Sequence, residues 1–141
     1  MVIWINGLSA SGKTTIGTRL AEKLRAQCEN VVYLDGDILR DVWGDSLGHD
    51  VQSRYMNATR ISNLCLLLDR QRIHVVAAVM SMFPEWQAWN RKHFSRYFEV
   101  FLDVPMETLY ARELKGLYHA FNDGKLTQVV GVDIPFPRPT C

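Results

Sequence analysis

The sequence predicts an α/β fold in which a parallel sheet is covered by helices on both faces. Short apolar runs rich in β-branched residues alternate with segments of helical periodicity, which is typical of strands joined by crossover helices. Polar residues gather where the apolar runs end, at the edge of a parallel sheet where ligands bind. A length of 141 residues supports one domain with a real core, so we expect a single domain over residues 1–141.

The first predicted elements are two strands and the helices that follow them. Residues 2–5 predict a strand because they are apolar and β-rich, and apolar residues at helical spacing predict a helix from Lys13 onward. The run VVYLDGD predicts a second buried strand that ends in acidic residues, and a short helix follows from Ile38.

The second half of the chain repeats this alternation. Helical spacing predicts a long helix over RYMNATRISNLCLLLDRQR, and IHVVAAVM predicts a third strand. We expect PEWQAWNRKHF to be helical and YFEVFLDVP to be a fourth strand, with Pro105 opening the next helix. Three of the five prolines fall in DIPFPRPTC, so we expect an extended segment over residues 133–141.

The stretch GLSASGKTT joins the first strand to the first helix. Four of its residues fit the phosphate-binding pattern G-x-x-x-x-G-K-[ST], in the strand-to-helix context that the pattern requires: Gly7, Gly12, Lys13 and Thr14. Backbone amides and the helix N-terminus would cradle a polyphosphate, with Lys13 reaching the β- and γ-phosphates and Thr14 joining the coordination of Mg²⁺. The alternative is a glycine-rich turn that binds nothing. The predicted phosphate-binding residues are Gly7, Ser9, Ala10, Ser11, Gly12, Lys13, Thr14 and Thr15.

Acidic residues follow the second predicted strand. Asp37 is the candidate base or orienting carboxylate, since an Asp at a strand end beside the phosphate loop can accept a hydroxyl proton. The alternative role of Asp37 is the N-cap of the helix from Ile38. Asp35 is a candidate for holding Mg²⁺-bound water, or else bonds to backbone, and Ser81 follows the third strand. Together with the loop, these groups predict a phosphoryl-transfer enzyme whose acceptor is a hydroxyl.

Charge and cysteine content narrow the functional classes. The formal net charge is only +1, so nothing global favours long nucleic acid or a membrane surface as a partner. Three widely spaced cysteines without a metal-ligand pattern favour reduced thiols in a cytoplasmic protein. No signal peptide, no apolar stretch of membrane-spanning length and no guanine-reading N-K-x-D motif is evident. We therefore expect a small nucleotide as the partner.

Five blocks of the sequence together resemble the adenylylsulfate kinase family, over almost the whole chain. In order they are GLSASGKTT, YLDGDILR, SRYMNATR, FEVFLDVP and KGLYHAFNDGKL. The resemblance implies a three-layer P-loop NTPase fold and a kinase that uses MgATP to phosphorylate the ribose 3′-hydroxyl of adenosine 5′-phosphosulfate. The family continues beyond PFPRP into one more strand and a helix. The resemblance therefore also implies that the fold of residues 1–141 lacks the family's last strand and helix.

The resemblance assigns acceptor-binding roles to residues that match the family's motifs. Asp37 and Arg40 fall on its D-G-D-x-x-R positions. Arg54 and Asn57 fall on its D-R-x-x-N positions, where Ser53 replaces the Asp. The acceptor-binding residues that the resemblance implies are Asp37, Arg40, His49, Arg54, Asn57, Ser81, Lys115 and Val129.

The resemblance also implies a mobile lid at about residues 112–130. Lys115 matches the lid lysine that closes over the phosphates, and Arg112 lies on the same lid or its supporting helix. A basic lid would neutralise charge on the transferring group and exclude water. The alternative is that both cations form an ordinary solvated helix end. The implied catalytic residues are Lys13, Asp37 and Lys115, and Arg112 joins the ATP-binding set.

The acceptor-base pocket departs from the family pattern. Two phenylalanines sandwich the acceptor's adenine in the family, and His49 and Val129 stand at those positions here. Aromatic stacking on a base is worth about 1–3 kcal/mol, so this change weakens the preference for adenine. Gln87 also stands where an arginine is common. The alternative acceptor to adenosine phosphosulfate is therefore a cytidine derivative such as cytidine diphosphoramidate, with the same reaction.

Three further interpretations concern activity, assembly and the tryptophans. An inactive nucleotide-binding paralogue would keep the fold and the phosphate loop without turnover. A homodimer is implied by the resemblance alone. Trp43, Trp86 and Trp89 are interpreted as core or subunit contacts and not as platforms for stacking a base.

Overall fold

A parallel four-stranded sheet forms the centre of the protein. The computed structural model describes residues 1–44, 47–113 and 116–139. The strands lie in the order β2-β3-β1-β4, and every pair is parallel. This confirms the predicted parallel sheet. The strands are β1 (Val2–Asn6), β2 (Val31–Asp35), β3 (His74–Val79) and β4 (Tyr97–Phe101).

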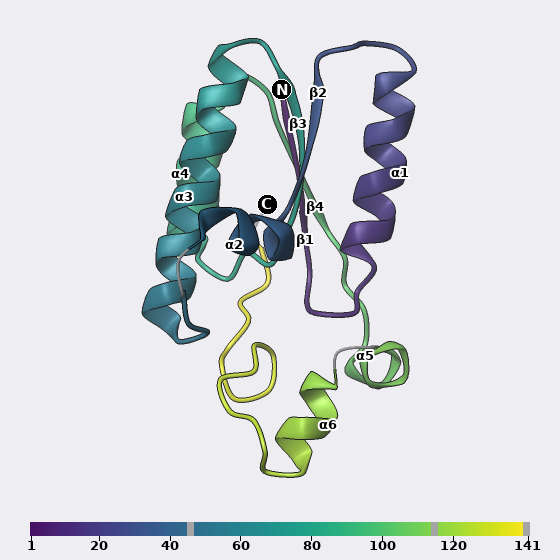
Figure 1. Ribbon diagram of the computed structural model, residues 1–141, viewed down its shortest axis with the longest axis vertical. Helices are drawn as coiled ribbons and strands as arrows, with labels where there is room; N and C mark the ends of the chain where they lie inside the picture. Colours follow the sequence, from purple (N-terminus) through teal and green to yellow (C-terminus); the bar gives the residue numbers. More distant parts are fainter. Residues whose placement is uncertain (45–46, 114–115, 140–141) are drawn as a thin grey trace.

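Helices cover both faces of the sheet and its carboxyl edge. Figure 1 shows α1 on one face and α3 with α4 on the other, which confirms the three-layer arrangement. The α5 and α6 helices lie beyond the carboxyl ends of the strands (Figure 1). The helices are α1 (Lys13–Arg25), α2 (Gly36–Trp43), α3 (Val51–Arg70), α4 (Pro84–His93), α5 (Met106–Arg112) and α6 (Leu117–Asn122).

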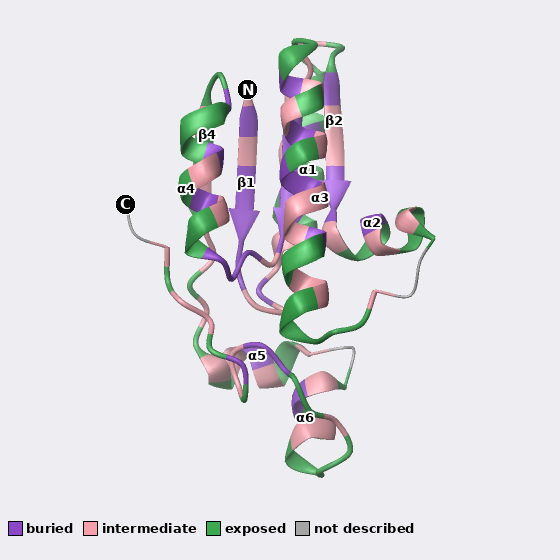
Figure 2. Cartoon of the chain, turned by 90° about the vertical axis from the view of Figure 1, so that its left-hand side faces the viewer, coloured by how far each residue is buried: buried purple, intermediate pink, exposed green. Residues whose placement is uncertain are grey.

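The core lies on both faces because strand residues alternate between them. Trp4 and Val75 pack on the face that includes Ile61 and Cys65 of α3. Ile5 and its neighbours pack against α1 on the other face. Figure 2 shows buried residues along β1 and at both ends of β2. The core therefore fixes the strands in register, so that their carboxyl ends meet at one edge.

The start of α2 corrects the predicted start of this helix and excludes the alternative role of Asp37 as its N-cap. The helix begins at Gly36 and not at Ile38, and its N-cap is Asp35 and not Asp37. The Asp35 carboxylate accepts hydrogen bonds from the backbone N–H of Asp37 at 2.9 Å and of Ile38 at 3.4 Å. Because Asp35 satisfies these unpaired amides, the Asp37 side chain is not needed as the cap.

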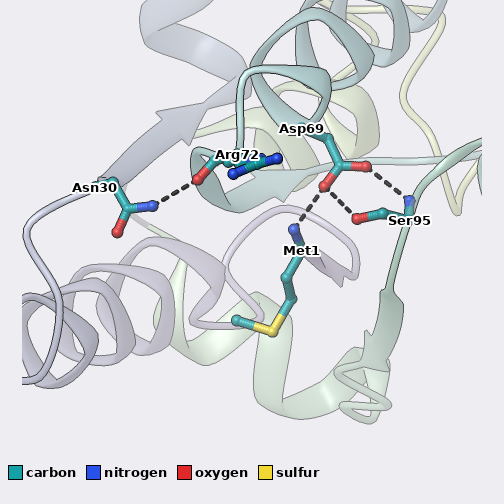
Figure 3. Close-up of polar contacts among 5 residues, drawn as sticks. All are labelled: Met1, Asn30, Asp69, Arg72 and Ser95. Carbon is teal, nitrogen blue, oxygen red and sulfur yellow. Dashed lines mark hydrogen bonds and ion pairs between the residues drawn. The ribbon is translucent and has the colours of Figure 1, made fainter.

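A polar network holds the amino ends of the strands together, at the end of the molecule opposite the loops described below. The Asp69 carboxylate bonds to the amino group of Met1 at 2.5 Å, and to the backbone N–H and hydroxyl of Ser95 at 2.7 and 2.8 Å (Figure 3). Burial alone would raise the pKa of Asp69, but these hydrogen bonds and the nearby positive charge lower it below its ordinary value. Asp69 thus joins the end of α3 to two other segments.

The segment after α6 folds back toward the phosphate loop. Residues 131–133 form a turn, in which the Asp133 carboxylate accepts hydrogen bonds from the backbone of Gln128 and Val129. Arg138 pairs with Asp103 at 2.8 Å. Residues 135–139 have no regular secondary structure. Within the described ranges, no helix is long and apolar enough to cross a bilayer.

Candidate active site

A cavity of about 910 Å³ lies at the carboxyl edge of the sheet. In the strand order β2-β3-β1-β4, β2 and β4 lie on opposite sides of the neighbouring pair β1 and β3. The strand order reverses at this pair, and ligands bind at the carboxyl ends of strands at such a point. Sixteen candidate residues line it: Ser9, Ala10, Ser11, Gly12, Lys13, Thr14, Thr15, Asp35, Asp37, Arg40, His49, Arg54, Asn57, Ser81, Arg112 and Val129. Gly7 begins the loop directly after β1 and does not line the cavity, and Lys115 lies outside the described residues.

The phosphate loop needs its two glycines for different reasons. Gly12 has φ of 95°, in the left-handed region, and nothing crowds the space that a Cβ would fill. Gly7 is limited by space, since a Cβ would lie 2.6 Å from Oγ of Ser11. Lys13 Nζ donates a hydrogen bond to the carbonyl of Leu8 at 2.7 Å, so the ammonium lies over the loop. The loop therefore has the backbone form of an anion-binding cradle.

Asp35 connects the phosphate loop to β2 and α2. Its Oδ2 accepts hydrogen bonds from the hydroxyl of Thr14 at 2.9 Å and from the hydroxyl of Tyr33 at 3.1 Å. Burial raises the pKa of Tyr33, so this phenol stays protonated and donates. The oxygen atoms of Thr14 and Asp35 are the ligand type that Mg²⁺ prefers, directly or through water. The residues present therefore fit the expected metal.

Asp37 reaches the cavity from the first turn of α2. Its side chain is exposed and lines the cavity, while its backbone is held by the Asp35 cap. The same helix presents Arg40 three residues later. One turn of α2 therefore supplies an acidic and a basic side chain to the cavity.

Two arginines give the cavity a cationic wall. Arg54 of α3 donates to the carbonyl of His49 at 2.7 Å and to that of Gln128 at 3.1 Å. Arg40 donates to the carbonyl of Gly48 at 3.1 Å. Burial, with the nearby charge of Arg40, lowers the pKa of Arg54. A bound anion would offset both effects, so this wall suits an anionic ligand.

Asn57 lies one turn further along α3 and is nearly buried. Its Oδ1 accepts a hydrogen bond from the indole N–H of Trp43, the last residue of α2, at 2.8 Å. Trp43 itself does not line the cavity and packs against the core, as predicted. Asn57 is thus held from behind by α2.

Ser81 belongs to a buried polar network at the end of β3. Its backbone exchanges two hydrogen bonds with the Asn6 side chain, at 2.8 and 3.0 Å. Gln87 donates to the Ser81 carbonyl at 3.1 Å. Gln87 is 2% exposed and does not line the cavity, so it is a structural residue. The network fixes the loop after β3.

The α6 helix rests directly on the phosphate loop. Tyr118 is fully buried, and its hydroxyl donates to the carbonyl of Ser9 at 3.0 Å. Glu113 accepts hydrogen bonds from the backbone N–H groups of Leu117 and Tyr118 and so caps this helix. Arg112 ends α5 and lines the cavity. That residues 112–130 move as a lid stays a prediction.

The two positions that the resemblance assigns to the acceptor-base pocket both line the cavity. His49 is exposed, and Val129 is 5% exposed and packs with Leu109 and Tyr118. Not one of the lining residues that the structure describes is a phenylalanine. The aromatic side chains of this lining are Trp4, His49 and Tyr118.

Sequence reasoning missed three groups at this site. The hydroxyl of Tyr33 donates to Asp35, that of Tyr118 donates to the carbonyl of Ser9 in the loop, and the carbonyl of Gln128 accepts from Arg54. The only signal for the tyrosines is their position within or beside a motif, which does not show where a phenol points. Gln128 has φ of 59°, which sequence does not reveal.

The fold and the phosphate loop define a P-loop phosphotransferase. The family model described as adenylylsulphate kinase matches residues 1–141. A cytidine diphosphoramidate kinase of Campylobacter jejuni is 40% identical over 138 residues, which cover 98% of this chain and 81% of that protein. An adenylyl-sulfate kinase of Gloeothece citriformis is 34% identical over 139 residues, covering 99% and 79%.

Solved structures agree with these sequence matches. The Mycobacterium tuberculosis APS kinase CysC, in complex with AMPPNP and APS, superimposes with a TM-score of 0.85 at 34% identity, covering 99% of this chain and 83% of that chain. The chain therefore belongs to the adenylylsulphate kinase family. It is a kinase that transfers a phosphoryl group to an alcohol acceptor.

Proposed function

We propose that the protein transfers the γ-phosphoryl group of ATP to the ribose 3′-hydroxyl of a cytidine nucleotide such as cytidine diphosphoramidate. The observation that carries the choice of base is the cavity wall, where His49 and Val129 stand in place of an aromatic pair. Without aromatic stacking partners, a small pyrimidine loses less binding free energy than a purine does. The 40% identity to a cytidine diphosphoramidate kinase supports the same choice.

The proposed step is an in-line transfer assisted by groups of this chain. As the 3′-oxygen attacks the γ-phosphorus, its proton passes to the Asp37 carboxylate. The bond from the γ-phosphorus to the β–γ bridging oxygen breaks, and ADP leaves with that electron pair. Lys13 and the loop amides stabilise the charge that develops on the phosphates. Lys115 remains the predicted lid cation, outside the described residues.

Acceptor and metal are assigned to different groups of lining residues. Arg40, Arg54 and Asn57 would bind the acceptor's anionic 5′-group, and Ser81 lines the same cavity. Thr14, with Asp35 through water, would hold Mg²⁺. The metal, when bound, neutralises charge on the ATP phosphates. Arg112 would contact the ATP side of the same cavity.

Adenosine 5′-phosphosulfate is the second candidate acceptor. The match of the adenylylsulphate kinase model over residues 1–141 and the 34% identity to an adenylyl-sulfate kinase favour it. His49 can still stack in part on a purine. The two acceptors share the reaction and differ in the base and the 5′-substituent.

A coupled assay of ADP release tests the proposal. MgATP is supplied with either cytidine diphosphoramidate or adenosine 5′-phosphosulfate, and Lys13→Ala is the control. We expect kcat/KM to be higher with the cytidine compound and to fall roughly 100-fold or more in Lys13→Ala. A higher kcat/KM with the sulfate compound would favour the second candidate. Binding of nucleotide without turnover of either compound would favour an inactive paralogue.

Restoring the aromatic pair tests the base assignment separately. We expect the double variant His49→Phe with Val129→Phe to raise kcat/KM for adenosine 5′-phosphosulfate by roughly tenfold, since stacking contributes about 1–3 kcal/mol. Because Val129 is buried, a thermal melt must first show that the variant folds. An unchanged preference would contradict the assignment of these positions to the base.

A further inference from the structure

The contact between α2 and α3 behind the cavity determines which way the Asn57 amide faces. An indole N–H can only donate a hydrogen bond, so the atom of Asn57 that lies 2.8 Å from Nε1 of Trp43 must be the amide oxygen. With the oxygen held on the side of α2, the NH₂ group must occupy the other side. The hydrogen bond thus resolves the orientation that side-chain amides usually leave open.

The NH₂ group of Asn57 is available to the cavity. Asn57 is 8% exposed, and what remains exposed belongs to the cavity that it lines. Within the described part of the chain, no group accepts a hydrogen bond from Nδ2 of Asn57. Nδ2 is not one of the buried side-chain atoms without a partner, so a ligand or water in the cavity can accept a hydrogen bond from it. The site therefore presents a donor beside Arg54, which lies one turn earlier on α3.

Trp43 is well held where it makes this contact. It is the last residue of α2 and packs against the core that contains Leu39 and Ile61. The guanidinium of Arg60 lies over its ring, 5.9 Å from the ring centroid. Arg60 and Asn57 are three residues apart, so they share one face of α3. The indole is thus fixed on two sides, and its N–H has a fixed direction.

We infer that Trp43 is a positioning residue for the acceptor: it locks Asn57 as a hydrogen-bond donor to an anionic oxygen of the acceptor nucleotide. This inference rests on the proposed function, because it assumes that the acceptor occupies this cavity. Without the indole, the amide would be free to turn its oxygen toward the acceptor's anion, which repels it. Trp43 acts through Asn57 alone and contacts neither ATP nor the acceptor.

A double-mutant cycle on binding tests the inference without turnover. Cytidine 5′-diphosphate and adenosine 5′-phosphosulfate are titrated by calorimetry, with MgADP present, into the unmodified protein and into Trp43→Phe, Asn57→Ala and the double variant. We expect Trp43→Phe to raise the acceptor Kd about three- to tenfold and to leave the Kd of MgADP unchanged. In the Asn57→Ala background, Trp43→Phe should have no further effect on the acceptor Kd.

Trp89→Phe is the matched control. Trp89 packs against the same core cluster and lies outside the cavity lining, so the same substitution there should leave the acceptor Kd unchanged. Equal losses from Trp43→Phe in both backgrounds, or a parallel rise in the Kd of MgADP, would show a merely structural role and overturn the inference. So would an absence of acceptor binding by the unmodified protein. If Trp43 and Asn57 are coupled in acceptor binding but the kinase assay shows no ADP release, the proposed function is overturned and this inference stands.

Discussion

Asp35 shows how one residue can serve the fold and the site together. Its carboxylate accepts from the Thr14 hydroxyl, the Tyr33 hydroxyl and the backbone of Asp37 and Ile38. Each oxygen therefore has a different task, since Oδ1 caps α2 and Oδ2 faces the phosphate loop. Four hydrogen bonds hold this carboxylate in one orientation, which suits a group that assists a cation.

We predict that Asp35→Asn weakens Mg²⁺-dependent nucleotide binding. The amide keeps one acceptor oxygen but loses the negative charge, and an imperfect cap costs roughly 1 kcal/mol of folding stability. Calorimetric titration of ADP with and without Mg²⁺ measures the effect. The Mg²⁺-dependent gain in affinity should shrink in Asp35→Asn and persist in Asp41→Asn, which changes an exposed acid of the same helix. An undiminished gain would remove Asp35 from the metal site.

The packing of α1 on the sheet depends on one small residue. Gly17 is buried, and a Cβ there would lie 2.7 Å from Cε2 of Tyr33 and 3.3 Å from Cβ of Ala78. The absence of a side chain lets the Tyr33 ring pass under the helix, so that its hydroxyl reaches Asp35. A glycine within a helix costs stability in isolation, and here the close approach of helix and strand requires it.

We predict that Gly17→Ala destabilises the protein despite the higher helix propensity of alanine. Overpacking against Tyr33 should cost about 1–3 kcal/mol, which over most of this range exceeds the gain of about 1 kcal/mol from helix propensity. Urea unfolding measures the difference. Arg19→Ala, an exposed change on the same helix, is the control and should have little effect. A more stable Gly17→Ala would mean that Tyr33 has room to move.

The cavity and the Asp69 hydrogen-bond network lie at opposite ends of the sheet. The cavity lies at the carboxyl edge of the sheet, while the Asp69 network joins Met1, α3 and the segment before β4 at the amino edge (Figure 3). Parallel strands produce this division, since all their carboxyl ends lie together. Stability can therefore be changed at one end without touching the groups at the other.

We predict that Asp69 contributes stability that depends on pH. Its pKa is lowered in the folded state, so its contribution is present above the unfolded pKa of about 4 and is lost as the pH falls below it. Asp69→Asn should lower the free energy of unfolding by about 1.5–3 kcal/mol at pH 7. Thermal melts at pH 7 and at lower pH provide the measurement. The difference in melting temperature between the unmodified protein and Asp69→Asn should become smaller at low pH. A difference that does not change with pH would contradict a stabilising charge on Asp69.

Much of the architecture could be predicted, because it depends on local patterns. The alternation of apolar runs and helical spacing is enough for the parallel sheet, since buried strands and amphipathic helices have different periods. The spacing from Gly7 to Thr14 is enough for the loop, because a phosphate cradle needs these residue types at fixed intervals. The predicted start of α2 was wrong by two residues. Asp35 and Asp37 are both good N-cap residues, and their spacing does not show which of them caps the helix.

The sequence by itself therefore determined the fold class, the phosphate loop and about half of the described residues that line the cavity. Only the tertiary structure decided which side chains meet: Tyr33 with Asp35, Tyr118 with Ser9 and Trp43 with Asn57. The first set follows from periodicity and motif spacing, which act over a few residues. The second set depends on how helices and strands far apart in the chain pack, and on the direction of each side chain once they have done so.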